Sequence, residues 1–388
     1  MKLGLGLTAA VLLLSGCSLL APPQLGSDEG GRRAPVLPRL NSEPQPATGA
    51  HTYTLASQRQ NTVGRVQVIV ANESDTFSDI ARSYGLGYDE LRLANPDIDP
   101  WLPGAGTQII LPTRFVLPDA PREGVVLNIA AKRLFYYPPV ADGELPTVST
   151  YPIGIGREGW ATPVGVSKVI AKAKDPAWYV PASVRKEHRE AGDPLPAVVP
   201  AGPDNPLGRH VLKLDMPGYL LHGTNQPYGV GMRVSHGCVR LYPEDIEVLY
   251  SAVGLGVSVT LVNQPVLAGW QDAYFFIKAY PPLADDERDA AQLAAAALAH
   301  ARARFGDTVT ESFDAAVAQI ATTANARAIR WEYAGIDALT DAVLVENVTR
   351  GPQEGPSREE VLALIDEVMQ DEDAPDGAAS SAASSDGG

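Results

Sequence analysis

The sequence predicts a mainly β protein: a β-sandwich or barrel with one short helix, preceded by a small βααβ module and followed by an α-helical extension. Three observations predict this class. Residues 122–263 contain many short runs of β-branched and aromatic residues separated by turns. Residues 65–113 contain two helical patterns between two strand patterns. From residue 284 the chain is rich in alanine, with apolar residues at helical spacing.

The N-terminus has the pattern of an export signal. Lys2 precedes the apolar run Leu3–Leu14, which at about a dozen residues is shorter than the roughly 20 that span a bilayer. Leu14-Ser15-Gly16-Cys17 resembles the lipobox of bacterial lipoproteins. That resemblance implies that residues 1–17 hold the signal peptide and lipobox, and that Cys17 becomes the lipidated first residue. The alternative is ordinary secretion with a free Cys17.

Chain length and net charge limit the number of domains and the kinds of ligand. The chain has 388 residues, 45% of them apolar, which is enough for two or three domains with cores of their own. The formal net charge is −15, and residues 284–388 carry −14 of it, with 21 acidic and 7 basic side chains. The acidic character therefore belongs to the C-terminal part. A net negative chain without a basic patch is not expected to bind nucleic acid.

Two segments are predicted to lack a fold. Residues 18–64 are expected to be a flexible linker, because residues 18–50 are rich in Pro, Gly, Ser and Arg without apolar periodicity. A coil of that length spans roughly 30 Å on average, enough to lift a domain off a membrane surface. Residues 371–388 are mainly Asp, Ala, Ser and Gly, which cannot form a core, so a disordered tail is expected.

Residues 65–113 form the small βααβ module. Ser74 or Asp75 can cap its first helix, and the second helix stops before Asn95-Pro96 because the residue before proline disfavours the helical region. The segments DTFSDIARSYGLGYDELRLANPDID and GTQIILP resemble a LysM module, which implies affinity for glycans containing N-acetylglucosamine, such as peptidoglycan. The alternative is a packing subdomain without a ligand. The expected elements are the strand Val66–Val70, the helices Thr76–Tyr84 and Tyr88–Asn95, and the strand Gln108–Leu111.

The β-rich block, residues 122–263, includes one amphipathic helix, Pro243–Val253. Ile246, Leu249, Tyr250 and Val253 share one face of it. The strands expected around it are Val125–Ile129, Leu134–Tyr137, Thr147–Ile153, Val166–Lys174, His210–Asp215, Tyr219–His222 and Val257–Val262.

The last part of the chain is predicted to be helical. Residues 275–283 can add one more strand, and residues 284–370 are expected to be an acidic helical extension. Its role stays open between docking of a basic or lysine-bearing partner and a solvated appendage. Its helices are expected near 286–305, 309–330, 336–348 and 357–370, split by Gly306, Gly335 and Arg350–Ser357.

Cys238 has the surroundings of a nucleophilic cysteine. It lies in Ser235-His236-Gly237-Cys238-Val239-Arg240, and His222 lies sixteen residues upstream in Leu221-His222-Gly223-Thr224. The chain has two cysteines. If Cys17 is lipidated, Cys238 has no partner in an oxidising compartment, which suggests a reactive thiol or intermolecular pairing. An imidazole can take the thiol proton, and the amides of Gly237 and Cys238 can hold an oxyanion.

Other interpretations of these residues stay open. His222 and His236 can exchange roles, Ser235 can be a serine nucleophile, and Cys238 can be an ordinary buried thiol. A zinc site from His222, His236 and Cys238 is disfavoured, because two of these residues flank Gly237 on a tight turn and the chain has no CxxC or HExxH. No metal and no cofactor are therefore expected. The remaining histidines, expected to face solvent or to be structural, are His51, His188, His210 and His300.

The two motifs closely resemble the active-site signature of the L,D-transpeptidases, the YkuD-type catalytic domain. Further matches lie at Tyr151–Gly156, Thr162–Gly165 and Pro203–Gly208. The resemblance implies that Cys238 attacks the carbonyl of meso-diaminopimelate in a peptidoglycan tetrapeptide stem and releases D-Ala, with His222 as general base. It also implies that Ser235, His236 and Gly237 shape the loop and oxyanion site. Arg240 and Gly223 are assigned to substrate positioning.

The resemblance leaves the acyl acceptor open. A lysine or N-terminal amine would anchor a protein to peptidoglycan, a second diaminopimelate would give a 3→3 cross-link, and water would give carboxypeptidase action. The segments AGDPLPAVVPAGPDNPLG and RVSHGCVRL resemble the subgroup that attaches lipoproteins to peptidoglycan. Anchoring of an outer-membrane protein is the favoured outcome.

The expected location is the periplasm of a Gram-negative bacterium. Ser18 after the lipobox usually goes with sorting to the outer membrane, so we expect a lipid anchor there. The hypothesis of another class is a non-catalytic wall-binding lipoprotein tethered by its LysM-like module.

Overall fold

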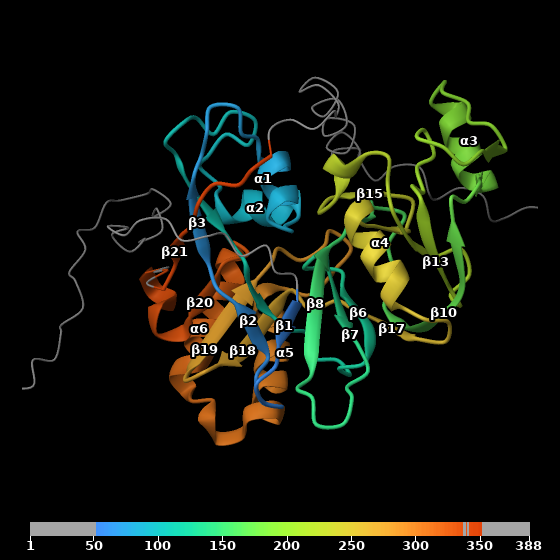
Figure 1. The fold of residues 1–388 in the computed structure, drawn as a ribbon. Coiled ribbons are helices and arrows are strands. Elements are labelled where there is room, and N and C mark those ends of the chain that lie inside the picture. The colour runs from blue at the N-terminus through green and yellow to red at the C-terminus, as the bar shows by residue number, and fades with distance from the viewer. Residues whose placement is uncertain (1–51, 337–338, 340, 351–388) are drawn as a thin grey trace, which may run out of the picture. The chain divides into compact units, whose positions relative to one another are not determined.

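The computed structural model describes residues 52–336, 339 and 341–350 (Figure 1). The predicted signal peptide with Cys17, the helix near 357–370 and the tail 371–388 lie outside the described residues. No helix within the described ranges combines the length and the apolar character needed to cross a membrane.

A nine-stranded mixed sheet forms the body of the protein, and it confirms the mainly β class. Its order is β1-β8-β7-β6-β17-β10-β13-β14-β16, with parallel pairs β6/β17 and β14/β16. The bounds are β1 Thr52–Thr54, β6 Gly124–Asn128, β7 Arg133–Tyr137, β8 Thr147–Pro152, β10 Gly165–Lys174, β13 His210–Leu214, β14 Leu220–His222, β16 Val239–Arg240 and β17 Ser258–Val262.

Side chains of the central strands point alternately to the two faces of the sheet, so the sheet contributes to two apolar cores. On β6, Val125 and Leu127 face one apolar core, while Val126 between them faces another. Successive side chains of a strand point to opposite faces, so a strand that is apolar throughout can be buried on both sides. Helix α4 (Pro243–Ala252) covers the first core with Ile246 and Leu249, as the sequence predicted.

A second helix in this region was not predicted from the sequence. Helix α3 (Ala182–Glu190) follows the hairpin strand β11 (Trp178–Tyr179) and precedes its partner β12 (Val198–Val199). Only Val184 of α3 is buried. A helix without an apolar face leaves no periodic signal in the sequence.

The small module has the four elements predicted, within a residue or two at each end. They are β3 (Gln67–Val70), α1 (Phe77–Ser83), α2 (Tyr88–Ala94) and β4 (Gln108–Leu111). The helix cap differs: the Thr76 hydroxyl, not Ser74 or Asp75, accepts from the Asp79 amide at 3.2 Å.

This module is packed on both faces. Val68 and Ile110 are paired across β3 and β4 and face a C-terminal core, while the neighbouring pair Ile69 and Ile109 faces the core shared with β6–β8. The module therefore shares its cores with the neighbouring parts of the protein and is not a separately folded domain.

The prediction of a flexible linker is wrong for residues 52–64. Strand β1 pairs with β8 at the edge of the large sheet, and β2 (Thr62–Gly64) pairs with β5 (Arg114–Val116). Leu55 and Val63 are 1% exposed in the shared core. Tyr53 and Leu55 alternate over only a few residues and Val63 stands alone, so the sequence pattern is too short to identify these strands.

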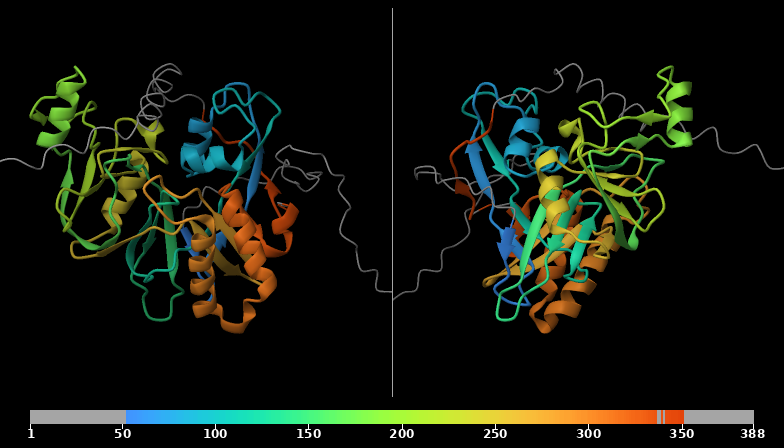
Figure 2. Two further views of the ribbon diagram at one scale, coloured as in Figure 1. Left: turned by 180° about the vertical axis from the view of Figure 1, so that it is seen from behind. Right: turned by 45° about the vertical axis from the view of Figure 1, so that its right-hand side comes forward.

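The C-terminal part is not an all-helical extension. Helices α5 (Ala290–Phe305) and α6 (Glu311–Thr323) cover a three-stranded sheet, β18-β19-β20 (Figures 1 and 2). The bounds are β18 Val266–Gln271, β19 Tyr274–Ala279 and β20 Ala328–Arg330. The predicted helix 309–330 ends early because Ala324 and Ala326 adopt positive φ, and the chain then pairs with β19.

The predicted helix 336–348 is also wrong. Val343–Leu344 is a short strand, β21, that pairs in parallel with β3 of the small module. Tertiary pairing outweighs local helix propensity at both places. The remaining elements are β9 (Ile155–Gly156), β15 (Arg233–Ser235) and the 3-10 turns Pro227–Gly229, Gly306–Thr308 and Trp331–Ile336.

A buried ionic cluster joins the small module, the nine-stranded sheet and the C-terminal sheet. Glu90 of α2 lies 2.6 Å from Arg133 Nη2 of β7 and 2.9 Å from Lys278 Nζ of β19. Burial would raise the pKa of Glu90, but the two cations hold it below its ordinary value. Removing one partner of such a cluster would leave a buried charge uncompensated.

Candidate active site

The pairing of β14 with β16 brings the two sequence motifs together. Leu221 pairs with Val239, and both side chains enter the core beneath. His222 pairs with Arg240, one residue along. Because side chains alternate, His222 and Arg240 lie on the face opposite the core. Register therefore places imidazole and guanidinium on one side, and Arg240 is close enough to influence the pKa of both His222 and Cys238.

The segment Tyr151–Gly156 supports the loop Ser235–Arg240, here called the Cys238 loop. Gly154 and Arg240 exchange two backbone hydrogen bonds of 2.9 Å, and Gly156 pairs with Ser235 through β9 and β15. A Cβ on Gly156 would lie 1.9 Å from the Trp160 carbonyl oxygen. Glycine is required there because two backbones pass too closely for any side chain.

Thr162 fastens the tip of the Cys238 loop. Its hydroxyl donates to the Gly237 carbonyl at 2.9 Å and accepts from the Gly156 amide at 3.0 Å. Gly237 has φ of 95°, a conformation that favours glycine, and a Cβ there would lie 3.1 Å from Tyr219. The Ser235 hydroxyl donates to the Cys238 carbonyl from the other side. The backbone around the thiol is therefore held by two hydroxyl groups.

His222 is buried and its ring is oriented by the backbone. Nδ1 lies 2.6 Å from the Gly223 carbonyl oxygen, so the neutral ring donates from Nδ1 and carries its lone pair on Nε2. Burial and the charge of Arg240 lower the pKa of His222 to about 3, although the carbonyls of Gly223 and Leu207 act in the opposite direction. The imidazole is therefore neutral at pH 7, with its Nε2 lone pair available as a hydrogen-bond acceptor.

Cys238 is half-buried, and its Sγ lies 3.5 Å from the Gly218 carbonyl oxygen. Burial raises the pKa of the thiol, while the Leu220 amide and Arg240 act to lower it. Thiol and imidazole are thus both neutral in the resting site. A thiolate at this position would require transfer of the proton to a base.

Arg240 forms no ion pair within the described part of the chain. Its Nε is buried without a hydrogen-bond partner, and burial lowers the pKa of the guanidinium. A guanidinium in this state binds a carboxylate favourably, because the anion compensates its charge and occupies its donors.

The amides of Gly237 and Cys238 donate no hydrogen bond to another group among the described residues. They are free to bind an oxyanion. Gly223 lies beneath His222, where its amide donates to the His210 carbonyl at 3.1 Å, and a Cβ would lie 3.2 Å from Ile246. Gly223 therefore allows close packing of the strand end on α4.

His236 points toward a group of residues that the sequence did not single out. Its Nε2 lies 3.3 Å from Glu187 Oε2 of α3 and 3.4 Å from Arg157 Nη2. Trp160 packs edge-on against the ring, with centroids 5.1 Å apart. Burial and the charges of Arg157, His188 and Arg240 lower the pKa of His236 to about 4. Glu187 also pairs with Arg157. No local motif marks Glu187; its helix is recognisable only in three dimensions.

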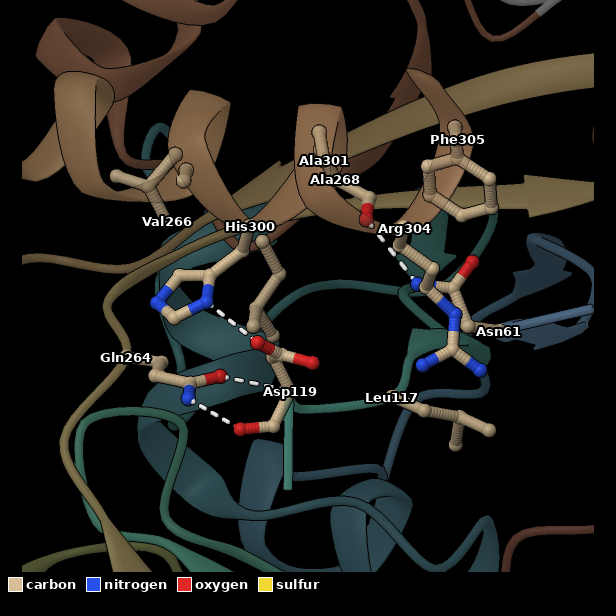
Figure 3. Close-up of a pocket in the computed structure, with 12 residues that line it drawn as sticks. Asn61, Leu117, Asp119, Gln264, Val266, Ala268, His300, Ala301, Arg304 and Phe305 are labelled. Atoms are coloured by element: carbon tan, nitrogen blue, oxygen red, sulfur yellow. Dashed lines mark hydrogen bonds and ion pairs between the residues drawn. The ribbon is translucent and has the colours of Figure 1, made fainter. Parts of the chain in front are cut away.

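The other described histidines have structural positions. His300 of α5 faces Asp119, whose main chain is bridged by the Gln264 amide, in a hollow apart from Cys238 (Figure 3). The ring of His210 packs on Tyr250 at 4.8 Å, and that of His188 lies 6.1 Å from His236.

Comparison with known proteins identifies the family. A sequence profile of YkuD, the L,D-transpeptidase catalytic domain, matches residues 122–262. The protein named "Probable L,D-transpeptidase YcfS" from Escherichia coli (strain K12) is 40% identical over 264 residues, which cover 66% of this chain and 81% of that protein. The chain belongs to the L,D-transpeptidase family.

Two further relatives from Escherichia coli (strain K12) extend this likeness. "Probable L,D-transpeptidase YbiS" is 42% identical over 242 residues, or 61% of this chain and 78% of that protein. "Probable L,D-transpeptidase ErfK/SrfK" is 40% identical over 220 residues, or 56% and 69%. The family assignment made from the Cys238 motif is therefore confirmed. As a member of this family, the protein is an enzyme that acts on peptidoglycan.

Proposed function

We propose that this L,D-transpeptidase forms a thioester between Cys238 and the meso-diaminopimelate residue of a tetrapeptide stem, and then transfers the acyl group to a lysine amine of an outer-membrane protein. The observation that carries the proposal is that Arg240 of β16 pairs with His222 of β14 and influences the pKa of both His222 and Cys238. The three groups supply a nucleophile, a base and an anion-binding site.

In the first half-reaction, His222 accepts the Cys238 proton and the thiolate attacks the carbonyl between diaminopimelate and D-Ala. The tetrahedral oxyanion is held by the Gly237 and Cys238 amides. Collapse breaks the C–N bond, and the imidazolium returns its proton to the leaving D-Ala amine. The low pKa of His222 supports the second transfer, because a strongly acidic imidazolium gives up its proton readily.

Arg240 is proposed to bind a carboxylate of the donor stem. Its lack of an ion pair in the described chain supports this role. Gly223 acts indirectly, because it lets the His222 strand end pack on α4.

In the second half-reaction, the acceptor amine attacks the thioester and restores the thiol. The net charge of the chain supports a lysine-bearing acceptor, since residues 284–388 carry most of the −15. Asp285 joins this acidic part to the segment Tyr151–Gly156 that supports the Cys238 loop, because it lies 3.4 Å from Arg233, whose Nε donates to the Gly156 carbonyl at 3.2 Å. The runner-up is a 3→3 cross-link to a second diaminopimelate amine.

The proposed location is the periplasm, with a lipid on Cys17 anchoring the enzyme to the outer membrane. The proposed role of the LysM-like module is to hold the enzyme on glycan strands. The dense packing of β3 and β4 on both neighbouring cores supports a fixed distance between that module and Cys238.

The test is incubation of the full chain with purified disaccharide-tetrapeptide, followed by mass spectrometry beside Cys238→Ala. We expect loss of D-Ala and a thioester on Cys238 that resolves when a lysine-bearing outer-membrane protein is added. A 3→3 dimer without added protein would favour the cross-linking alternative. Equal products from the wild type and Cys238→Ala would overturn the proposed chemistry and revive a non-catalytic wall-binding role.

A further inference from the structure

The segment that joins β14 to β15 contacts both the small module and Arg240. Residues 227–232, here called the connecting turn, link the strand of His222 to the loop of Cys238. Met232 of this turn is buried, and it packs in the apolar core that also holds the two helices of the module. The position of the connecting turn therefore depends on the module.

Two glycines make a direct backbone contact between the module and the connecting turn. A Cβ on Gly87, the residue before α2, would lie 2.8 Å from the Gly231 Cα. A Cβ on Gly231 would lie 2.4 Å from the Gly87 Cα, and Gly231 has φ of 92°. Beside this contact, the Tyr88 amide donates to the Val230 carbonyl at 3.3 Å. Two backbones meet here without a side chain that could move aside.

Two side-chain contacts fasten the same part of the module to the segment that follows the Cys238 loop. The Tyr242 hydroxyl donates to the Leu86 carbonyl at 3.2 Å in a buried position. Arg82 of α1 lies 2.8 Å from Glu244 of α4. The module therefore contacts the chain both before and after the Cys238 loop.

The connecting turn in its turn contacts Arg240. A Cβ on Gly229 would lie 3.9 Å from Arg240 Nη1, so the guanidinium lies beside the backbone of the connecting turn. Tyr228 is close enough to influence the pKa of Arg240. The Met232 carbonyl accepts from the Ile155 amide at 3.0 Å, in the segment that supports the Cys238 loop. A displacement of the connecting turn would therefore reach both the guanidinium and this segment.

We propose that Gly87 is a positioning residue for the L,D-transpeptidase reaction: the small module holds the connecting turn, and the connecting turn holds Arg240 where it meets the donor carboxylate. The inference rests on the proposed role of Arg240. It gives the module a task in the reaction itself, besides the proposed binding of glycan. Because the contact joins backbone to backbone in a close-packed region, no change of rotamer can absorb an added methyl group.

Gly87→Ala tests the proposal. Gly87 has φ of −87°, which alanine adopts without strain, and the added methyl group would overlap only the connecting turn. The substrate is the free tetrapeptide, which carries no glycan, so a loss of glycan binding cannot affect the result. We expect kcat/KM for D-Ala release to fall about tenfold, mainly through KM, because a displaced Arg240 binds the donor carboxylate less well.

A second measurement does not depend on the proposed function. Cys238 is alkylated with iodoacetate and with iodoacetamide at equal ionic strength, and mass spectrometry of the Cys238 peptide gives the ratio of the two rates. Both reagents need the thiolate, but only iodoacetate is an anion, so the ratio reports the charge of Arg240 near the sulfur. We expect this ratio to fall about threefold in Gly87→Ala, and Arg240→Gln gives its value without the charge.

Three further variants separate positioning from a loss of stability. Thr76→Ala removes the cap of α1, whose hydroxyl is bonded within the module to Asp79. Gly254→Ala adds a methyl group at an exposed glycine with open space around it. Both controls should keep the wild-type kcat/KM and alkylation ratio. Tyr242→Phe removes the buried hydrogen bond to the module and should change both quantities in the same direction as Gly87→Ala, by less.

The proposal is overturned if folded Gly87→Ala keeps both the alkylation ratio and kcat/KM of the wild type. It is also overturned if Thr76→Ala loses as much, because the stability of the module would then be responsible. If the wild type releases no more D-Ala than Cys238→Ala while the alkylation ratio still falls in Gly87→Ala, the proposed chemistry fails and the positioning role stands. If Gly87→Ala does not fold, Tyr242→Phe decides by the same two measurements.

Discussion

Glu187 Oε2 of helix α3 lies 3.3 Å from His236 Nε2 in the Cys238 loop. The same carboxylate pairs with Arg157, so one side chain of α3 holds both His236 and the segment after Gly156. Helix α3 has a single buried residue, Val184, and little apolar contact of its own. This polar contact therefore determines how the helix meets the loop that carries the thiol.

Replacing Glu187 tests that relationship. In Glu187→Gln the charge that binds Arg157 and His236 is lost, and we expect kcat for D-Ala release to fall about tenfold because the loop is less well positioned. Lys186→Gln, one residue away and exposed, is the matched control and should retain kcat. A Glu187→Gln enzyme with normal kcat and only a lower Tm would assign this contact to stability alone.

The Thr162 hydroxyl offers a second test of loop positioning. Thr162→Val removes the donor to the Gly237 carbonyl and the acceptor for the Gly156 amide. We expect kcat to fall about 10- to 100-fold and the free energy of unfolding to fall by about 1–3 kcal/mol. Steady-state kinetics and denaturant unfolding measure the two effects. Thr162→Ser keeps the hydroxyl and should recover most of both; failure of this rescue would contradict the role of the hydrogen bonds.

The protonation state of Cys238 predicts a simple pH dependence for the free enzyme. The pKa of the thiol is raised, and His222 and His236, with pKa values of about 3 and about 4, gain no charge near pH 6.5. Alkylation by iodoacetamide, followed on the Cys238 peptide by mass spectrometry, should therefore accelerate about tenfold per pH unit from pH 6 to 8. A plateau near neutral pH would instead reveal a preformed thiolate–imidazolium pair.

Asp245 predicts a pH dependence of stability. It is 6% exposed, Oδ2 has no hydrogen-bond partner, and burial with Glu244 nearby raises its pKa to about 7. Because the folded-state pKa lies above the unfolded one, the protonated form favours folding below about pH 4, and this stability is lost as pH rises through 7. Asp245→Asn should thus raise the free energy of unfolding at pH 8 by on the order of 2 kcal/mol.

Denaturant unfolding of Asp245→Asn at pH 5 and pH 8 makes the comparison. The gain should be smaller at pH 5, where most of the aspartic acid is already neutral. An equal gain at both values would show that packing, and not charge, is responsible. Glu247→Gln serves as a control, because this exposed residue lies on the same helix and its loss should leave stability near that of wild type at both pH values.

The sequence by itself determined the family and most local elements, and it predicted the nucleophile. The Cys238 motif is contiguous, and the strands and helices of the LysM-like module follow from alternation, turn residues and a proline stop, all of which act over a few residues. The order βααβ and the helix at Pro243 were predicted for the same reason.

Only the tertiary structure decided which distant groups meet. Glu187 contacts His236 because α3 folds back on the Cys238 loop, and Thr162 reaches Gly237 because β9 lies beside β15. Residues 328–330 and 343–344 became strands because β19 and β3 offered them unpaired edges. Long-range pairing overrides local propensity when a buried backbone must satisfy its hydrogen bonds, and that requirement cannot be seen in a short stretch of sequence.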